Sequence, residues 1–286
     1  MIKIASDSTT DLGVLYEERD IKVMPMSVIL GSDSLDDGVT VTPKDIYKFV
    51  EKSNMLPKTA ARSRQEYVEF FEKILTSSDD TLIFFSLSSG LSVTYSNAKA
   101  ASEEFDGRVF VVDGRSLSSG TGLLVLYACD LRDEGKLSAS EIYEKVCERI
   151  PYVQASFFVD TMAYLHKGGR CSGLESFFAT ALKIKPSLIL KEGRIVVGQK
   201  YRGRAEAIAQ KYVDNICDMF SNPDLKRVFV TYTYGTDADV IKEVKRALNE
   251  RYKFDVVYET TASSTITCHC GKGTIGILYI NDGDKH

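Results

Sequence analysis

The segment TLIFFSLSSGLSVTYSNAKAASEEFDGRVFVVD, residues 81–113, decides the fold class of this chain. It begins with a continuous apolar run, TLIFFS (81–86), which is typical of a strand buried on both faces. A helical pattern near 92–104 follows, and RVFVVD (108–113) is a second apolar run. Two such strands joined by a helix of this length indicate a crossover connection, and therefore a parallel sheet.

The same alternation extends through the rest of the first half. The predicted elements are a strand at 2–6, a helix from Asp11, one strand at 22–30, helices beginning at Thr42-Pro43 and Ser63, a long helix near 118–133 and a helix from Ser138 to about Ile150. Proline suits the first position of a helix, and a serine followed three residues later by glutamate forms a capping box. The first half is therefore predicted to be a parallel-sheet α/β domain.

Pro151 is predicted to separate two domains, residues 1–151 and residues 152–286. The second half mixes hairpin and crossover connections, which indicates a mixed sheet. Its predicted elements are strands at 154–160, 227–234, 254–259 and 274–280, helices near 173–183, 204–219 and 237–250, and a hairpin at 186–199 with its turn at Glu192-Gly193. The predicted fold is a two-domain α/β protein, with an N-terminal parallel-sheet domain and a C-terminal mixed-sheet domain.

Composition excludes several classes of protein. The 286 residues are 44% hydrophobic and 27% charged, with a net charge of −4, so no basic excess favours nucleic-acid binding. No apolar stretch reaches the roughly 18 residues that a membrane span requires. The first residues lack the pattern of a signal peptide, and the six cysteines are scattered through apolar segments. These features predict a cytoplasmic protein with buried free thiols.

Loops that follow the predicted parallel strands are rich in hydroxyl groups and glycine. They are SDSTTDL (6–12), SLSSGLSVTYSNA (86–98) and DGRSLSSGTG (113–122). In open α/β sheets, ligands bind beyond the carboxyl ends of the strands. Hydroxyls and free N–H groups at helix starts attract anions, although each loop taken alone is explained by ordinary helix capping. Together the three loops favour an anion site.

The second half supplies cationic groups. HKGGRCSG (166–173) presents Arg170 after two glycines, and Lys200, Arg202 and Arg204 follow the predicted hairpin. An arginine is usually a solvated surface charge. Arg170 is the better candidate for holding a carboxylate or phosphate, because a Gly-Gly turn can bring it between the domains.

The stretch CHCGKGTIG (268–276) contains three residue types that bind metals. Zinc ligands are normally spaced so that four side chains surround the ion, and no second ligand pair exists, so we predict no metal site. If the stretch is extended, His269 lies on the face opposite Cys268 and Cys270. Glycines 271, 273 and 276 indicate a chain passing close to another segment, with His269 directed into a pocket.

A hydrolase remains the alternative function. Serines are abundant and His269 is a candidate base, but the G-x-S-x-G elbow of many serine hydrolases is absent. A triad is recognised by geometry, so a Ser–His hydrolase of a small ester or phosphoester stays open.

Six ordered motifs resemble those of the DegV family of bacterial fatty-acid-binding proteins, over nearly the whole chain. They are DSTTDL (7–12), DDGV (36–39), LSVTYSNA (91–98), YLHKGGRCS (164–172), the pair ALKIKPSL and KYRGRAEAI (181–188 and 200–208), and HCGKGTIG (269–276). The resemblance implies a two-domain α/β fold and a long-chain fatty acid, such as palmitate, in a buried tunnel. Apolar runs of the second half, including 157–165, 177–182 and 187–197, are candidates for the tunnel wall or for plain core.

The resemblance also implies which residues hold the carboxylate near the domain seam. Ser92, Arg170 and His269 match the family's head-group residues, and Thr94 lies in the same motif as Ser92. Thr59 and Ala60 occupy the family's Thr-Ser-x-Pro-Ser motif, where Ala60 leaves only a backbone N–H to donate. Some members present the fatty acid to a separate fatty acid kinase, which makes the acyl phosphate. The resemblance thus implies a lipid-binding protein with no catalytic residue, metal or cofactor.

Overall fold

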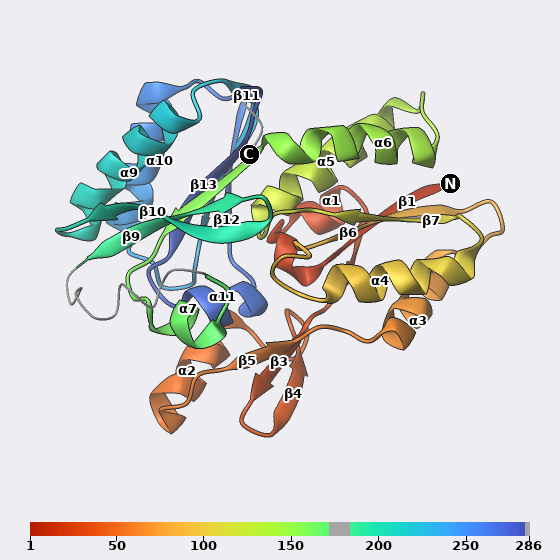
Figure 1. The fold of residues 1–286 in the computed structure, drawn as a ribbon, viewed down its shortest axis with the longest axis horizontal. Helices are drawn as coiled ribbons and strands as arrows, with labels where there is room; N and C mark the ends of the chain where they lie inside the picture. The colour runs from red at the N-terminus through yellow and green to blue at the C-terminus, as the bar shows by residue number, and fades with distance from the viewer. Residues whose placement is uncertain (172–183, 284–286) are drawn as a thin grey trace.

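The computed structural model describes residues 1–171 and 184–283, and its strands form two large sheets and one small sheet (Figure 1). The first large sheet is entirely parallel, in the order β2-β1-β6-β7. Its strands are β1 (Ile2–Asp7), β2 (Ile21–Met24), β6 (Thr81–Ser86) and β7 (Val109–Asp113). The crossover predicted between 81–86 and 108–113 is confirmed, because β6 and β7 pair in parallel with α4 (Thr94–Ser102) between them.

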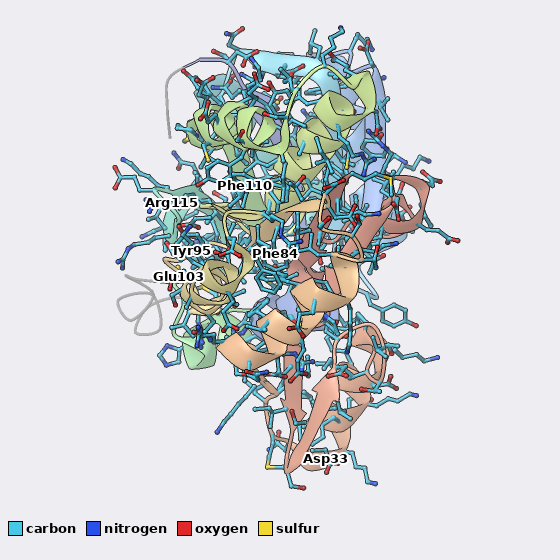
Figure 2. All side chains as sticks on the ribbon, turned by 90° about the vertical axis from the view of Figure 1, so that its right-hand side faces the viewer. Asp33, Phe84, Tyr95, Glu103, Phe110 and Arg115 are labelled. Atoms are coloured by element: carbon cyan, nitrogen blue, oxygen red, sulfur yellow. The ribbon has the colours of Figure 1, made fainter. Side chains whose placement is uncertain are left out.

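Helices cover both faces of this sheet (Figure 1). On one face lie α5 (Ser119–Glu134) and α6 (Ala139–Arg149), and on the other lie α3 (Arg64–Ile74) and α4. The second face is held by aromatic packing, since the ring of Phe84 meets the rings of Tyr67 and Phe71 with centroids 5.4 Å away in each case. Figure 2 shows Phe84 in the middle of this layer.

A small antiparallel sheet projects from this layer, in the order β4-β3-β5. It consists of β3 (Ser27–Leu30), β4 (Asp33–Asp36) and β5 (Lys58–Ala60), with α2 (Pro43–Ser53) beside it. Asp33 marks its outer tip in Figure 2. The prediction of one strand at 22–30 is wrong, because Pro25 lacks the N–H that a ladder needs, and the chain leaves the first sheet there.

The second large sheet is mixed, in the order β10-β9-β8-β13-β11-β12. Among its described strands, only β11 and β12 pair in parallel. Its strands are β8 (Val153–Phe158), β9 (Lys185–Lys191), β10 (Arg194–Tyr201), β11 (Pro223–Tyr232), β12 (Val256–Thr261) and β13 (Ile275–Asn281), and α9 (Ala205–Met219) and α10 (Ala238–Arg251) cover its outer face (Figure 1). The predicted hairpin turn is confirmed, with positive φ at Glu192 and Gly193.

The two large sheets share one hydrophobic core. Helix α5 packs against β1 of the first sheet and against β8 and β13 of the second. Ile4, Leu124 and Phe229 belong to the same buried cluster. All strands of the first sheet precede residue 151 and all strands of the second follow it. Because the core crosses this boundary, the division into domains 1–151 and 152–286 stays a prediction.

Several local predictions have definite outcomes. The capping boxes at Ser63 and Ser138 are present, and Pro43 opens α2. The helix from Asp11 is a single turn, α1 (Leu15–Glu18). The helix predicted near 173–183 lies outside the described residues, and α7 (Ala163–Gly168) was not predicted.

The extended conformation assumed for 268–270 is wrong. These residues end α11 (Ser264–Cys270), in which the hydroxyl of Ser263 accepts a hydrogen bond from the Ile266 N–H. A capping serine starts the helix and Gly271, at a φ of 72°, ends it. Helix α11 packs against α7, α2, β3 and β5, so it lies where the second half meets the small sheet (Figure 1).

Candidate ligand-binding site at the seam

An apolar cavity of about 70 Å³ lies beyond the carboxyl ends of β6 and β7, where both halves of the chain meet. The described residues that line it are Met26, Thr59, Ala60, Ala61, Leu87, Leu91, Ser92, Leu117, Leu165, Arg170, Ile195, Thr265, Ile266, His269 and Cys270. The position agrees with the rule that open α/β sheets bind ligands at this edge.

Five of the six predicted site residues line this cavity: Thr59, Ala60, Ser92, Arg170 and His269. Thr94 does not line the cavity. Its Oγ1 lies 2.8 Å from the Ser92 Oγ, so a hydrogen bond between the two side chains orients the Ser92 hydroxyl. Thr59 and Ala60 arrive on β5, and Ser92 arrives on the loop that follows β6. Of the predicted tunnel residues, Leu165 and Ile195 line the cavity, and 177–182 lies outside the described residues.

The hairpin between β9 and β10 closes one side of the cavity because its turn is fastened to the first half. The Ser88 hydroxyl donates to the Gly193 carbonyl at 2.6 Å, and an Arg115 N–H donates to the Glu192 carbonyl at 2.8 Å. A Cβ on Gly90 would lie 2.5 Å from the Gly193 oxygen, so only glycine permits this approach. The contact places Ile195 over the cavity.

His269 is held at the cavity by two close neighbours. Its Nε2 lies 2.8 Å from the Thr59 Oγ1, which joins α11 to β5. A Cβ on Gly168 would lie 2.6 Å from the His269 Nδ1, so the end of α7 packs directly on the imidazole. The Nδ1 atom is buried and has no hydrogen-bond partner among the described residues.

The electrostatic environment keeps this imidazole neutral. Burial is the main cause that lowers the pKa of His269 from 6.5 to about 4, and the nearby positive charge of Arg170 is the second cause. Arg170 itself is exposed and donates from its guanidinium to the Gly168 carbonyl. The polar part of the described lining, called the head of the cavity from here on, therefore combines the positive charge of Arg170 with the neutral His269 and three hydroxyls, those of Thr59, Ser92 and Thr265.

Hydroxyls in two of the three predicted anion-binding loops serve another purpose. The Ser8 hydroxyl donates to Asp37 at 2.9 Å. The Thr9 hydroxyl donates to Asp7 at 2.5 Å. The Ser118 hydroxyl donates to Asp11, also at 2.5 Å. These donors are satisfied by buried carboxylates. Only the loop after β6 contributes a hydroxyl, that of Ser92, to the cavity lining.

Two of these aspartates attach the first half to α11. Asp37 accepts from the N–H groups of Ser264 and Thr265, at 2.8 and 3.1 Å, and Asp11 accepts from the Ser263 N–H at 2.8 Å. Burial raises the pKa of Asp7 to about 6 and that of Asp11 to about 7, against the opposing effect of the hydrogen bonds that each carboxylate accepts. The DSTTDL and DDGV motifs thus hold the helix that carries His269.

Cys268 and His269 face different surroundings. Cys268 is buried with Val28, Val41 and Ile46, whereas His269 faces the cavity with Cys270. Among residues 1–171 and 184–283, no three histidine, cysteine or acidic side chains converge as metal ligands would. The expectation of no metal stays a prediction. Gly271 and Gly273 do pass close to other groups, since added Cβ atoms would meet Tyr164 at 2.6 Å and Asp160 at 2.8 Å.

Sequence reasoning missed Thr265. Its position one helical turn before His269 would have indicated a shared face, but only if the segment had been predicted as a helix. It also missed Gly168 as the residue that packs on His269, although the Gly-Gly pair before Arg170 was a usable signal.

Comparison with known proteins agrees with this geometry. The family model described as "Uncharacterised protein, DegV family" matches residues 1–282. The chain belongs to the DegV family. A DegV domain-containing protein of Caldanaerobacter subterraneus subsp. tengcongensis is 30% identical over 282 residues, which cover 97% of this chain and 98% of that protein.

Solved structures of DegV proteins share the whole fold. A fatty-acid-binding DegV family protein from Thermus thermophilus superposes with a TM-score of 0.87 at 28% identity, covering 98% of this chain and 99% of that one. DegV from Bacillus subtilis, described as a fatty acid binding protein, gives a TM-score of 0.83 at 28% identity, with 98% and 99% coverage. The predicted DegV fold, with one parallel and one mixed sheet, is confirmed.

Within the described residues, every helix is too short or too polar to cross a bilayer. The cytoplasmic location inferred from the sequence stays a prediction.

Proposed function

We propose that this DegV family member binds one long-chain fatty acid, with its carboxylate at Thr59, Ser92, Arg170 and His269 and its acyl chain among the apolar residues of the cavity. The observation that carries the proposal is that the described lining of one cavity combines apolar side chains with the cationic Arg170 and hydroxyl donors. Similarity to the two fatty-acid-binding structures supports it.

Transfer energies favour a long chain. An acyl chain with about 14 methylenes gains on the order of 11 kcal/mol on leaving water, at ~0.8 kcal/mol per methylene. Association costs about 4–15 kcal/mol, so a short chain would retain little affinity. A buried carboxylate would lose much of this gain unless it is paired, which is the role of Arg170 and the hydroxyls.

Binding must widen the cavity. Its volume of about 70 Å³ is below the roughly 300–1,000 Å³ of typical ligand pockets. Leu91, Ile195 and Ile266 are apolar side chains of the lining. We therefore expect apolar side chains of the hairpin and of α11 to move on binding.

A non-catalytic role is part of the proposal, and the histidine geometry supports it over a Ser–His hydrolase. The hydroxyl bonded to His269 is that of Thr59, and no described residue orients the Nδ1. A histidine with a pKa near 4 is a weak base at neutral pH. The alternative hydrolase therefore lacks an activated nucleophile here.

The head of the cavity is near the surface, since Ala60 and Arg170 are exposed. We propose that the carboxylate is presented there to a separate fatty acid kinase. In that reaction a carboxylate oxygen attacks the γ-phosphorus of ATP, the bond to the bridging oxygen breaks and ADP leaves, giving the acyl phosphate.

The test is extraction of the purified protein under denaturing conditions, followed by mass spectrometry. We expect a long-chain fatty acid near one equivalent, and a melting temperature raised by added palmitate or oleate. Absence of both results would remove the lipid function. For presentation, the loaded protein with ATP should give a hydroxylamine-trapped hydroxamate only when a fatty acid kinase is added. Hydroxamate formed without the kinase would contradict the non-catalytic role.

A further inference from the structure

One hydroxyl of the cavity lining has no hydrogen-bond partner in the described part of the protein. Thr265 lines the cavity and is 5% exposed, and its Oγ1 is buried and unpaired. The other lining hydroxyls are engaged, that of Thr59 with His269 and that of Ser92 with Thr94. A buried donor without an acceptor costs free energy, so this hydroxyl is suited to an acceptor that arrives with a ligand.

The position of Thr265 explains why the protein provides no acceptor. A helical threonine can donate to the carbonyl four residues before it. Thr265 is the second residue of α11, and the residue four positions earlier is Thr261, the last residue of β12. Its backbone N–H is already used, since it donates to Asp37 at 3.1 Å. The side-chain hydroxyl is left as the free donor.

Thr265 lies on the same face of α11 as His269. Residues four apart on a helix have Cβ atoms about 5–6 Å apart and one above the other. Ile266 and Cys270, which also line the cavity, complete this face. An acceptor group lying along the face can therefore contact both Thr265 and the Thr59–His269 pair.

We propose that the Thr265 hydroxyl donates a hydrogen bond to a carboxylate oxygen of the bound fatty acid. The inference rests on the proposed function and extends its head-group site by one residue. A carboxylate only accepts hydrogen bonds and has about four acceptor positions, so one hydrogen bond from Arg170 and one from each of two hydroxyls leave a position for a further donor. The head group then lies along α11, between Thr265 and His269, with Arg170 at its exposed side.

The test compares three variants of the full chain. Thr265→Val keeps the shape and removes the hydroxyl, and Thr265→Ser keeps the hydroxyl. Thr267→Val is the matched control, because Thr267 is fully buried on the same helix but is not among the lining residues. Palmitate affinity, the melting temperature without ligand, and the carboxyl ¹³C resonance of bound [1-¹³C]palmitate are measured for each.

For Thr265→Val we expect palmitate affinity to fall about tenfold or more, with a displaced carboxyl resonance. Its melting temperature without ligand should be unchanged or higher, since valine has no hydroxyl to bury. Thr265→Ser and Thr267→Val should bind palmitate like the wild type. If Thr265→Val does not fold, Thr265→Ala takes its place, and it should bind weakly where Thr265→Ser binds well.

Unchanged palmitate affinity and an unchanged carboxyl resonance in Thr265→Val would overturn the inference. The carboxylate is the only hydrogen-bond acceptor in palmitate, so losing a hydrogen bond from Thr265 must affect that group. A lowered melting temperature with normal affinity would overturn it too, and would show that the hydroxyl is bonded within the protein. Both results leave fatty-acid binding intact. A wild-type protein that binds neither palmitate nor oleate would instead remove the proposed function, and this inference with it.

Discussion

Thr59 and His269 are 210 positions apart in the chain, and a hydrogen bond of 2.8 Å joins the Thr59 Oγ1 to the His269 Nε2. The bond links β5 in the first half to α11 in the second, at the wall of the cavity. A ligand that contacts this pair therefore contacts both halves of the protein.

Removal of the Arg170 side chain should weaken fatty-acid binding and leave the fold intact. A charge-assisted hydrogen bond contributes about 1.5–3 kcal/mol, so Arg170→Ala should lower palmitate affinity by about 10- to 150-fold. Its described contact with the protein is the Gly168 carbonyl, so the melting temperature without ligand should change little. A loss of several degrees with normal affinity would show that Arg170 is structural.

His269→Ala should also weaken palmitate binding, by about tenfold or more, because the imidazole orients the Thr59 hydroxyl. The lost hydrogen bond should lower the free energy of unfolding by only about 1 kcal/mol. Calorimetric titration with palmitate and thermal unfolding measure the two effects. Normal affinity combined with a large loss of stability would mean that His269 serves the core alone.

Gly168→Ala should disturb the site through His269. The new Cβ would lie 2.6 Å from the His269 Nδ1, so the imidazole must shift. We expect a cost of about 1–3 kcal/mol in stability and a loss of affinity of roughly tenfold. Gly169→Ala is the matched control, because Gly169 has a φ of +65° but nothing within 4 Å of its added Cβ. The Gly169→Ala variant should lose stability through backbone strain and keep its palmitate affinity. Equal losses of palmitate affinity in the two variants would exclude the proposed effect of Gly168 on His269.

The His269 imidazole should titrate far below neutrality. Its pKa is lowered from 6.5 to about 4, first by burial and then by Arg170. Between these values the unfolded chain binds the extra proton, so acidification from about pH 6.5 to 4 should destabilise the protein. The chain has three histidines, so NMR can follow each ring. Arg170→Ala should raise the His269 pKa, and an unchanged value would show that the two groups do not interact.

Asp11 should give the opposite pH dependence. Its pKa is raised from 3.8 to about 7, first by burial, so the folded protein holds an extra proton between these values. The stability contribution is complete below about pH 4 and is lost as the pH rises to about 7, by about 1.4 kcal/mol per pH unit. An asparagine at this position cannot titrate, so the wild type and the Asp11→Asn variant should diverge in denaturant unfolding across this window. Parallel curves would contradict the assigned protonation.

Local sequence rules predicted most of the secondary structure. Capping boxes at Ser63 and Ser138 and the Glu192-Gly193 turn depend on neighbouring residues, so the sequence specifies them directly. Errors arose where a short segment depends on distant partners. Helix α11 was missed because its first N–H groups are satisfied by Asp37, more than two hundred positions away.

The sequence by itself determined the alternating strands and helices, the parallel pairing of β6 and β7, and the residue types of the cavity head, because these follow from apolar periodicity, capping and motifs. Only the tertiary structure decided which of those groups meet. Ser8, Thr9 and Ser118 bond to buried aspartates and so are withheld from the cavity, whereas Thr265 is left unpaired beside it. Packing between segments far apart in the chain decides which partner a hydroxyl bonds to. The residues next to that hydroxyl in the sequence do not specify this partner.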